Sequence, residues 1–145
     1  MGKETLGLIE KVTVYGNDGR KAEVYALMDT GASTTSIDIK LASKLRLGPI
    51  VGYVKVKSKT NIGSDEVIRV AVPLELEIKG QRIKVPKANL AVRENMSTLM
   101  LIGRDVLLNR FVVDVSLTHE TIEAKNGLKN KNLIEQLKKV DVVEE

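Results

Sequence analysis

The sequence predicts a mainly β protein with one or two short helices. Short runs rich in Val, Leu and Ile alternate with clusters of turn-forming residues along most of the chain. There is one Phe, three Tyr and no Trp, so the core has to be built from aliphatic side chains. With 145 residues, the chain is long enough for a single domain with one hydrophobic core.

The first third of the sequence predicts a hairpin, a loop and a helix. Residues 8–15 and 21–28 have the composition of strands, and the turn cluster from Gly16 to Gly19 separates them. Residues 29–36 are small and polar, which is typical of a loop. The apolar residues of 38–45 follow a spacing that is closer to helical than to alternating.

The rest of the chain continues as short strands. Residues 67–78 predict a long strand in which Pro73 indicates an edge or a bulge, and a turn follows at 79–81. Residues 104–109 are expected to form one or two helical turns. The other expected strands are 51–57, 83–85, 89–92, 99–102, 111–115 and 121–124.

We divide the chain into a domain over residues 1–125 and a C-terminal tail over 126–145. In the tail, Leu133, Ile134, Leu137 and Val140 lie on one face of a predicted amphipathic helix. The tail is therefore expected to act as an appendage of the domain.

Charge and composition exclude several classes of protein. The net charge of +4 is a mild excess, and the few aromatic residues argue against base stacking, so no nucleic-acid partner is expected. No segment reaches the roughly 18 apolar residues of a membrane span. The chain has no Cys, which suits a cytoplasmic location. We expect a soluble cytoplasmic protein.

The segment from Asp29 to Ser33 is the main candidate for chemistry. An apolar run, Ala26 to Met28, delivers a carboxylate to a loop made of Thr30, Gly31, Ala32 and Ser33. Gly31 allows backbone to approach backbone, and Thr30 is placed to fix the geometry. Asp-Thr-Gly on its own is also a common turn, in which Asp accepts a hydrogen bond from the backbone.

Peptide hydrolysis by carboxylates requires two acids about 3 Å apart that share one proton. The ionised acid activates a water molecule, and the protonated acid donates to the scissile carbonyl. Because the sequence holds one such loop, a working pair requires a two-fold homodimer with Asp29 from each copy.

A second motif lies downstream, from Met100 to Leu107. Together with the Asp29 loop, it resembles the retropepsin family of aspartic proteases, which includes the retroviral proteases. The resemblance implies a closed β-barrel covered by a flap hairpin, with Asp29 as the catalytic residue. It also implies that Gly103 passes beneath the Asp29 loop and that Arg104 braces it.

The sequence is also similar to a cellular branch of that family, labelled ATP-dependent zinc proteases and associated with ATP-grasp glutamate ligases. The similarity covers residues 8–121, and its order of motifs includes Arg110 to Asp114. One departure concerns Ser33, where retroviral members usually carry an acid that pairs with the Arg after Gly. Arg104 is therefore expected to find another partner.

The residues do not predict a metal or a cofactor. There is no Cys, no His-Glu-x-x-His run and one histidine, His119. No phosphate-binding Gly-rich loop is present, so any dependence on ATP has to come from a partner protein.

The resemblance places the flap at residues 54–70, with its tip near Ile62 and Gly63. The basic residues of this region, Lys55, Lys57, Lys59 and Arg69, outnumber its acids, Asp65 and Glu66. One interpretation is a solvated hairpin; the other is a basic flap that favours acidic peptides.

Two functions remain open from the sequence. The first is a homodimeric aspartic endopeptidase that acts on peptide or protein substrates. The second is a non-catalytic interaction domain that keeps the fold and the dimer but hydrolyses nothing.

Overall fold

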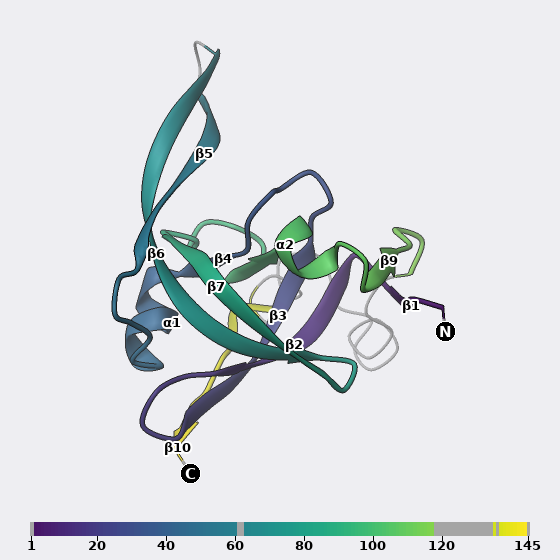
Figure 1. Ribbon diagram of the computed structural model, residues 1–145, viewed down its shortest axis with the longest axis horizontal. Helices are drawn as coiled ribbons and strands as arrows, with labels where there is room; N and C mark the ends of the chain where they lie inside the picture. Colours follow the sequence, from purple (N-terminus) through teal and green to yellow (C-terminus); the bar gives the residue numbers. More distant parts are fainter. Residues whose placement is uncertain (1, 61–62, 118–134, 136, 145) are drawn as a thin grey trace.

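The computed structural model describes residues 2–60, 63–117, 135 and 137–144. Within them the chain is mainly β with two short helices, as the sequence predicts (Figure 1). The elements are β1 (Glu4–Leu6), β2 (Ile9–Tyr15), β3 (Arg20–Met28), β4 (Ser36–Asp38), α1 (Ile39–Lys44), β5 (Gly52–Thr60), β6 (Gly63–Ile78), β7 (Gln81–Ala91), β8 (Met100–Ile102), α2 (Arg104–Leu107), β9 (Phe111–Val113) and β10 (Val142–Glu144).

In the described part of the chain, six strands close into a barrel in the order β3, β2, β6, β7, β4 and β8, with β8 returning to β3. The pairs β4–β7 and β3–β8 are parallel, and the other pairs of the ring are antiparallel. Two strands pair with the same edge of β3. Strand β8 pairs with the end of β3 at Met28, and β10 pairs with the start of β3 at Arg20. The barrel therefore includes the strand that leads into Asp29.

A separate parallel pair lies beside the barrel. Strand β1 pairs with β9, and the register joins Glu4 to Phe111 and Leu6 to Val113. The pair brings the segment after α2 next to the N-terminus (Figure 1).

Two tight turns set the registers of the hairpins. Asp18 and Gly19 join β2 to β3 with φ angles of 56° and 73°. Lys79 and Gly80 join β6 to β7 with φ angles of 51° and 78°. Two consecutive residues with positive φ form the hairpin turn whose twist matches that of the strands, and Gly adopts this conformation without steric cost.

The expected irregularity at Pro73 is a bulge. Val72 pairs with Ala88 and Leu74 pairs with Val85, so Pro73 on β6 faces Pro86 and Lys87 on β7. A residue that lacks an N–H fits where the ladder is interrupted. The sequence predicted two short strands for this part of the chain, at 83–85 and 89–92. The structure joins them into β7, because the bulge absorbs Pro86.

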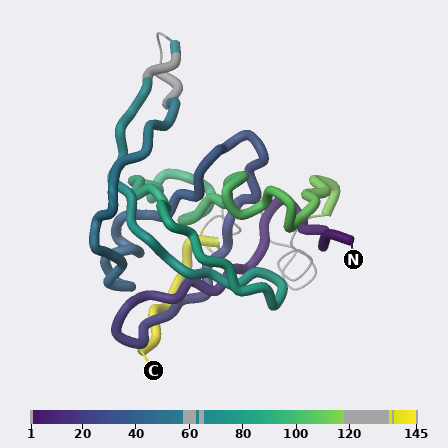
Figure 2. Tube along the Cα trace, in the orientation of Figure 1, coloured from purple at the N-terminus to yellow at the C-terminus, as the bar shows by residue number. Residues whose placement is uncertain are grey.

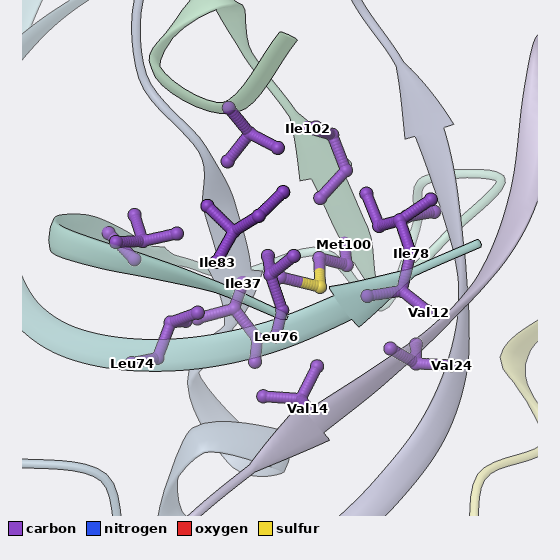
Figure 3. Close-up of a cluster of buried hydrophobic side chains, with 14 of the residues drawn as sticks. Val12, Val14, Val24, Ile37, Leu74, Leu76, Ile78, Ile83, Met100 and Ile102 are labelled. Atoms are coloured by element: carbon purple, nitrogen blue, oxygen red, sulfur yellow. The ribbon is translucent and has the colours of Figure 1, made fainter. Parts of the chain in front are cut away.

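The core is aliphatic, as expected. Val12, Ile37, Leu76 and Met100 come from four different strands, are fully buried, and point toward one another inside the barrel (Figure 3). Alternation along each strand places their neighbours on the outer face of the barrel. On β4, β7 and β8, residues outside this core line the candidate site described below.

Both predicted helical segments are confirmed. Helix α1 starts after Asp38, whose carboxylate accepts hydrogen bonds from the backbone N–H groups of Lys40 and Leu41. Helix α2 follows Gly103 and forms one turn. Helix α1 lies between β4 and β5, and helix α2 lies between β8 and β9.

Strand β5 and the first part of β6 form a hairpin that stands out from the barrel (Figures 1 and 2). It coincides with the predicted flap, and its last described pair joins Thr60 to Gly63. The predicted tip residue Ile62 lies outside the described residues, as do His119, the expected strand at 121–124, and Leu133 and Ile134 of the tail. Farther along the tail, Leu137 is buried and Val140 packs against the core.

Candidate active site

Asp29 lies at the point where β3 leaves the barrel. Its backbone N–H donates a hydrogen bond to the carbonyl oxygen of Ile102 at 2.8 Å, which ties the start of the loop to β8. The N–H of Gly31 donates to Oδ1 of Asp29 at 2.9 Å. The carboxylate is half-buried and is oriented by the backbone of its own loop.

The segment at Gly103 supports this loop from below. The N–H of Arg104 donates to the carbonyl oxygen of Ala32 at 2.8 Å. A Cβ at Gly103 would lie 2.7 Å from the carbonyl carbon and oxygen of Thr34, closer than a side chain permits. The two motifs singled out in the sequence therefore pack directly against each other at a position where only Gly fits.

The partner of Arg104 is the backbone of the loop. Its Nη1 donates to the carbonyl oxygen of Thr30 at 3.0 Å, on the exposed side of the site. As expected from Ser33, the partner of Arg104 is not an acid at position 33.

The sequence did not reveal a second connection, between Thr35 and Asp105. The hydroxyl of Thr35 donates to Oδ1 of Asp105 at 2.7 Å and accepts a hydrogen bond from the N–H of Gly103 at 3.2 Å. The N–H of Thr35 donates to Oδ2 of Asp105 at 2.9 Å. The sequence features that could have indicated this contact are the Thr that follows the small loop residues and the Asp that follows Arg104.

A pocket of about 950 Å³ opens on one side of Asp29. Gly31, Ala32, Ser33 and Arg104 line it together with Asp29, and Lys57 of the β5–β6 hairpin reaches it from above. Gly63 is farther out along the hairpin, in strand β6. Most of the predicted site residues thus meet in one cleft.

The floor of the pocket is polar and includes residues that the sequence did not single out as a group. Ser36, Arg69, Asn89 and Arg93 line the pocket. Arg93 is only 5% exposed, and burial lowers the pKa of its guanidinium, as does the neighbouring charge of Arg69; Asp38 and Asp29 act in the opposite direction. Nothing around Arg93 in the sequence marks it, because it lies in a short polar segment between strands.

A second cavity next to the Asp29 loop has a mainly apolar lining. This smaller cavity of about 330 Å³ is lined by Asp29 and Thr30, together with apolar side chains that include Val113 and Val115. Val115 is 69% exposed, and Leu108 and Val112 nearby in the sequence are also exposed. Exposed apolar side chains therefore lie at this second cavity next to the loop.

None of the described residues forms a group of three or more His, Cys, Asp or Glu side chains placed to hold a metal ion. Among the same residues, no helix is long and apolar enough to cross a membrane.

Three solved structures are similar to this chain, and the first of them shares its fold. Lpg0085, a protein of unknown function from Legionella pneumophila, is 20% identical, with 83% of this chain and 99% of that chain covered and a TM-score of 0.53. The EIAV protease in complex with the inhibitor HBY-793 is 22% identical over 68% of this chain and 83% of its own, with a TM-score of 0.45. A retropepsin-like aspartic protease from Rickettsia conorii is 18% identical over 70% and 80%, also with a TM-score of 0.45.

No curated protein matches the sequence. The family model described as gag-polyprotein putative aspartyl protease matches residues 16–109, which is more than half of the chain. The matched region contains both the Asp29 loop and the Gly103 segment that supports it. This chain therefore belongs to the family of retropepsin-like aspartyl proteases.

Proposed function

We propose that this protein is a homodimeric aspartic endopeptidase. The observation that carries the proposal is the loop at Asp29, whose carboxylate is held by the N–H of Gly31 at the edge of a large pocket. One chain supplies one such carboxylate, and the reaction needs a pair that shares a proton. The second carboxylate is Asp29 of a second copy.

In this mechanism the ionised Asp29 takes a proton from a water molecule as the water oxygen attacks the scissile carbonyl carbon. The protonated Asp29 of the other copy donates its proton to the carbonyl oxygen. The tetrahedral species, which now carries two hydroxyl groups, then collapses: the C–N bond breaks as the leaving nitrogen receives a proton from the pair. One hydroxyl group returns its proton to the pair as the C=O bond re-forms. Atoms and charge balance with water as the only co-reactant.

We also propose that this protein belongs to the cellular branch of the family named in the sequence analysis. The proposal does not include a zinc ion. The chain has no Cys and one His, so its own residues do not supply the ligands of a typical zinc site. Substrate preference for acidic peptides is also part of the proposal. It is supported by Lys55 and Lys57, which line the pocket from the hairpin.

The test is the Asp29→Asn variant, because an amide does not share the proton of the pair. We expect loss of peptidase activity by at least about a thousandfold, with the fold and the dimer retained. The matched control is Asp114→Asn, which removes an acid of the same size outside the pocket and is expected to keep activity. Full turnover by Asp29→Asn on a peptide that the wild type cleaves would refute the proposed role of Asp29.

A further inference from the structure

The floor of the Asp29 pocket is formed by three neighbouring strands. Ser36 on β4 is in register with Asn89 on β7 and with Leu101 on β8. All three residues line the pocket, whereas their neighbours Ile37, Ala88 and Ile102 fill the core. The alternation of the strands therefore places one row of side chains, with the polar Ser36 and Asn89 beside Leu101, at the cleft.

Arg93 is a buried cation at this floor. Its Nε donates to the carbonyl oxygen of Thr98 at 3.0 Å, and its Nη2 contacts the hydroxyl of Thr98 at 3.4 Å. Among the residues that the structure describes, Nη1 has no hydrogen-bond partner, and no carboxylate lies within ion-pair distance of this guanidinium.

Asp38 acts on the charge of Arg93 through space, as Asp29 does, but it does not form an ion pair with the guanidinium. Its carboxylate accepts hydrogen bonds from the backbone N–H of Arg93 and from two N–H groups at the start of α1. A buried charge without a directly paired counterion is costly, and an anion supplied from outside reduces that cost.

Arg69 adds a second cation to the same wall. Its Nη1 donates to Oδ1 of Asn89 at 3.3 Å. Asn89 is itself fixed, because its Nδ2 donates to the hydroxyl of Thr34 and to the carbonyl oxygen of Thr35, both at 3.0 Å. Arg69 is thus held beside Arg93 although like charges repel, an arrangement that favours an anion between them.

The hydroxyl of Ser36 is the third element. Ser36 is 3% exposed, and its Oγ has no hydrogen-bond partner among the described residues. A buried hydroxyl at the floor of a pocket is expected to meet a polar group of whatever fills that pocket.

We propose that Arg69 and Arg93, together with Ser36 on β4, form a subsite that binds one carboxylate group of the substrate. Guanidinium groups suit carboxylates because their planar forks donate paired hydrogen bonds. The subsite lies in the pocket that contains Asp29, so it positions the peptide relative to the catalytic pair; in this sense the inference rests on the proposed function. The carboxylate belongs to an Asp or Glu side chain or to the C-terminus of the peptide.

The experiment measures binding to the Asp29→Asn protein, which holds peptides without cutting them. The probes are peptides of equal length that contain either Glu or Gln, each with a free or an amidated C-terminus. A charge-assisted contact predicts at least about tenfold tighter binding of the peptide that carries the recognised carboxylate. A Glu preference among the amides identifies a side chain; a preference for free acids among the Gln peptides identifies the C-terminus.

Arg69→Gln, added to the same background, is expected to reduce the preference to about twofold or less. The matched control is Lys84→Gln, on an exposed position of β7 outside the pocket, which is expected to keep the full preference. Arg93→Gln repeats the measurement at the buried position; if that variant does not fold, Arg69→Gln decides alone. Equal binding of all the peptides, or a preference that survives Arg69→Gln, overturns the proposal.

The dependence of binding on salt distinguishes contacts at this subsite from long-range attraction by the exposed lysines of the hairpin. Attraction by Lys55 and Lys57 is expected to fade as the screening length shrinks to about 10 Å near 0.1 M salt, whereas contacts with the buried guanidinium persist. A carboxylate preference that disappears in salt also counts against the subsite. Cleavage assays keep the two proposals apart: turnover without carboxylate preference refutes the subsite alone, and preferential binding without turnover by the wild type refutes the peptidase alone.

Discussion

Thr35 and Asp105 are 70 positions apart in the sequence, yet both carboxylate oxygens of Asp105 accept hydrogen bonds from Thr35. One comes from the hydroxyl and the other from the backbone N–H. Since the same hydroxyl accepts from Gly103, the contact links the end of the Asp29 loop to the start of α2. It fixes the relative position of the two motifs that build the site.

We expect Thr35→Val to destabilise the protein by about 1–3 kcal/mol, because it leaves the buried N–H of Gly103 without its acceptor. Urea unfolding, followed by circular dichroism, gives the change in free energy. Thr35→Ser, which keeps the hydroxyl, is the control and is expected to lose much less. Equal stability of the Val variant and the wild type would show that the hydroxyl is not needed to hold the loop.

Gly103→Ala is expected to destabilise the protein by about 1–3 kcal/mol or more, because the added Cβ overlaps the Thr34 carbonyl group at 2.7 Å. Since Thr34 belongs to the segment that follows Asp29, activity is expected to fall along with thermal stability. Gly2→Ala serves as the control, since no atom lies within 4 Å of a Cβ placed there. An unchanged melting temperature for Gly103→Ala would contradict the tight packing described above.

The proposed mechanism predicts a dimer in solution, which sedimentation at micromolar concentrations detects. Under the proposed mechanism, we expect the second copy to dock near the cavity beside Asp29 and Thr30, which Val115 also lines, so a charge at Val115 is expected to weaken the dimer. We expect Val115→Asp to raise the dissociation constant by about tenfold or more and to lower activity in parallel.

Ile50→Asp provides the control for this experiment. Ile50 is 58% exposed but lies between α1 and β5, outside that cavity. We expect it to leave the dimer intact. A wild-type protein that stays monomeric at all concentrations, or a Val115→Asp variant that dimerises normally, would contradict the docking described here.

Asp114 is expected to titrate below the ordinary range of an aspartate. The hydroxyl of Ser116 and then its backbone N–H donate to the carboxylate, and both lower the pKa of Asp114. Because the pKa is lower in the folded state than in the unfolded state, the contact stabilises the protein above the unfolded pKa. That contribution is lost as the pH falls through the folded value.

An NMR titration of the Asp114 carboxyl tests this expectation. Ser116→Ala is expected to move the pKa back upward, because it removes the hydroxyl and leaves the backbone donor. An identical titration of Asp114 in the two proteins would show that the hydroxyl does not set the pKa.

Local sequence determined the elements that depend on neighbours along the chain. Asp18 with Gly19 predicted the turn between β2 and β3, because consecutive positive φ angles suit these residues. The alternating or apolar runs predicted most strands, and the small residues after Asp29 predicted the loop. The motif at Gly103 predicted its contact with that loop only through the resemblance to known proteases.

The tertiary structure decided which polar residues meet. Ser36, Arg69, Asn89 and Arg93 belong to different strands or to the segment that follows them, and each one alone reads as an ordinary surface residue. An alternation of apolar and polar residues with a period of two specifies which side of a strand is buried. It does not specify which strand is the neighbour or in which register the two strands pair. Closure of the barrel through β3 and β8 fixes both, and it thereby brings two guanidinium groups and a buried hydroxyl to the floor beneath Asp29.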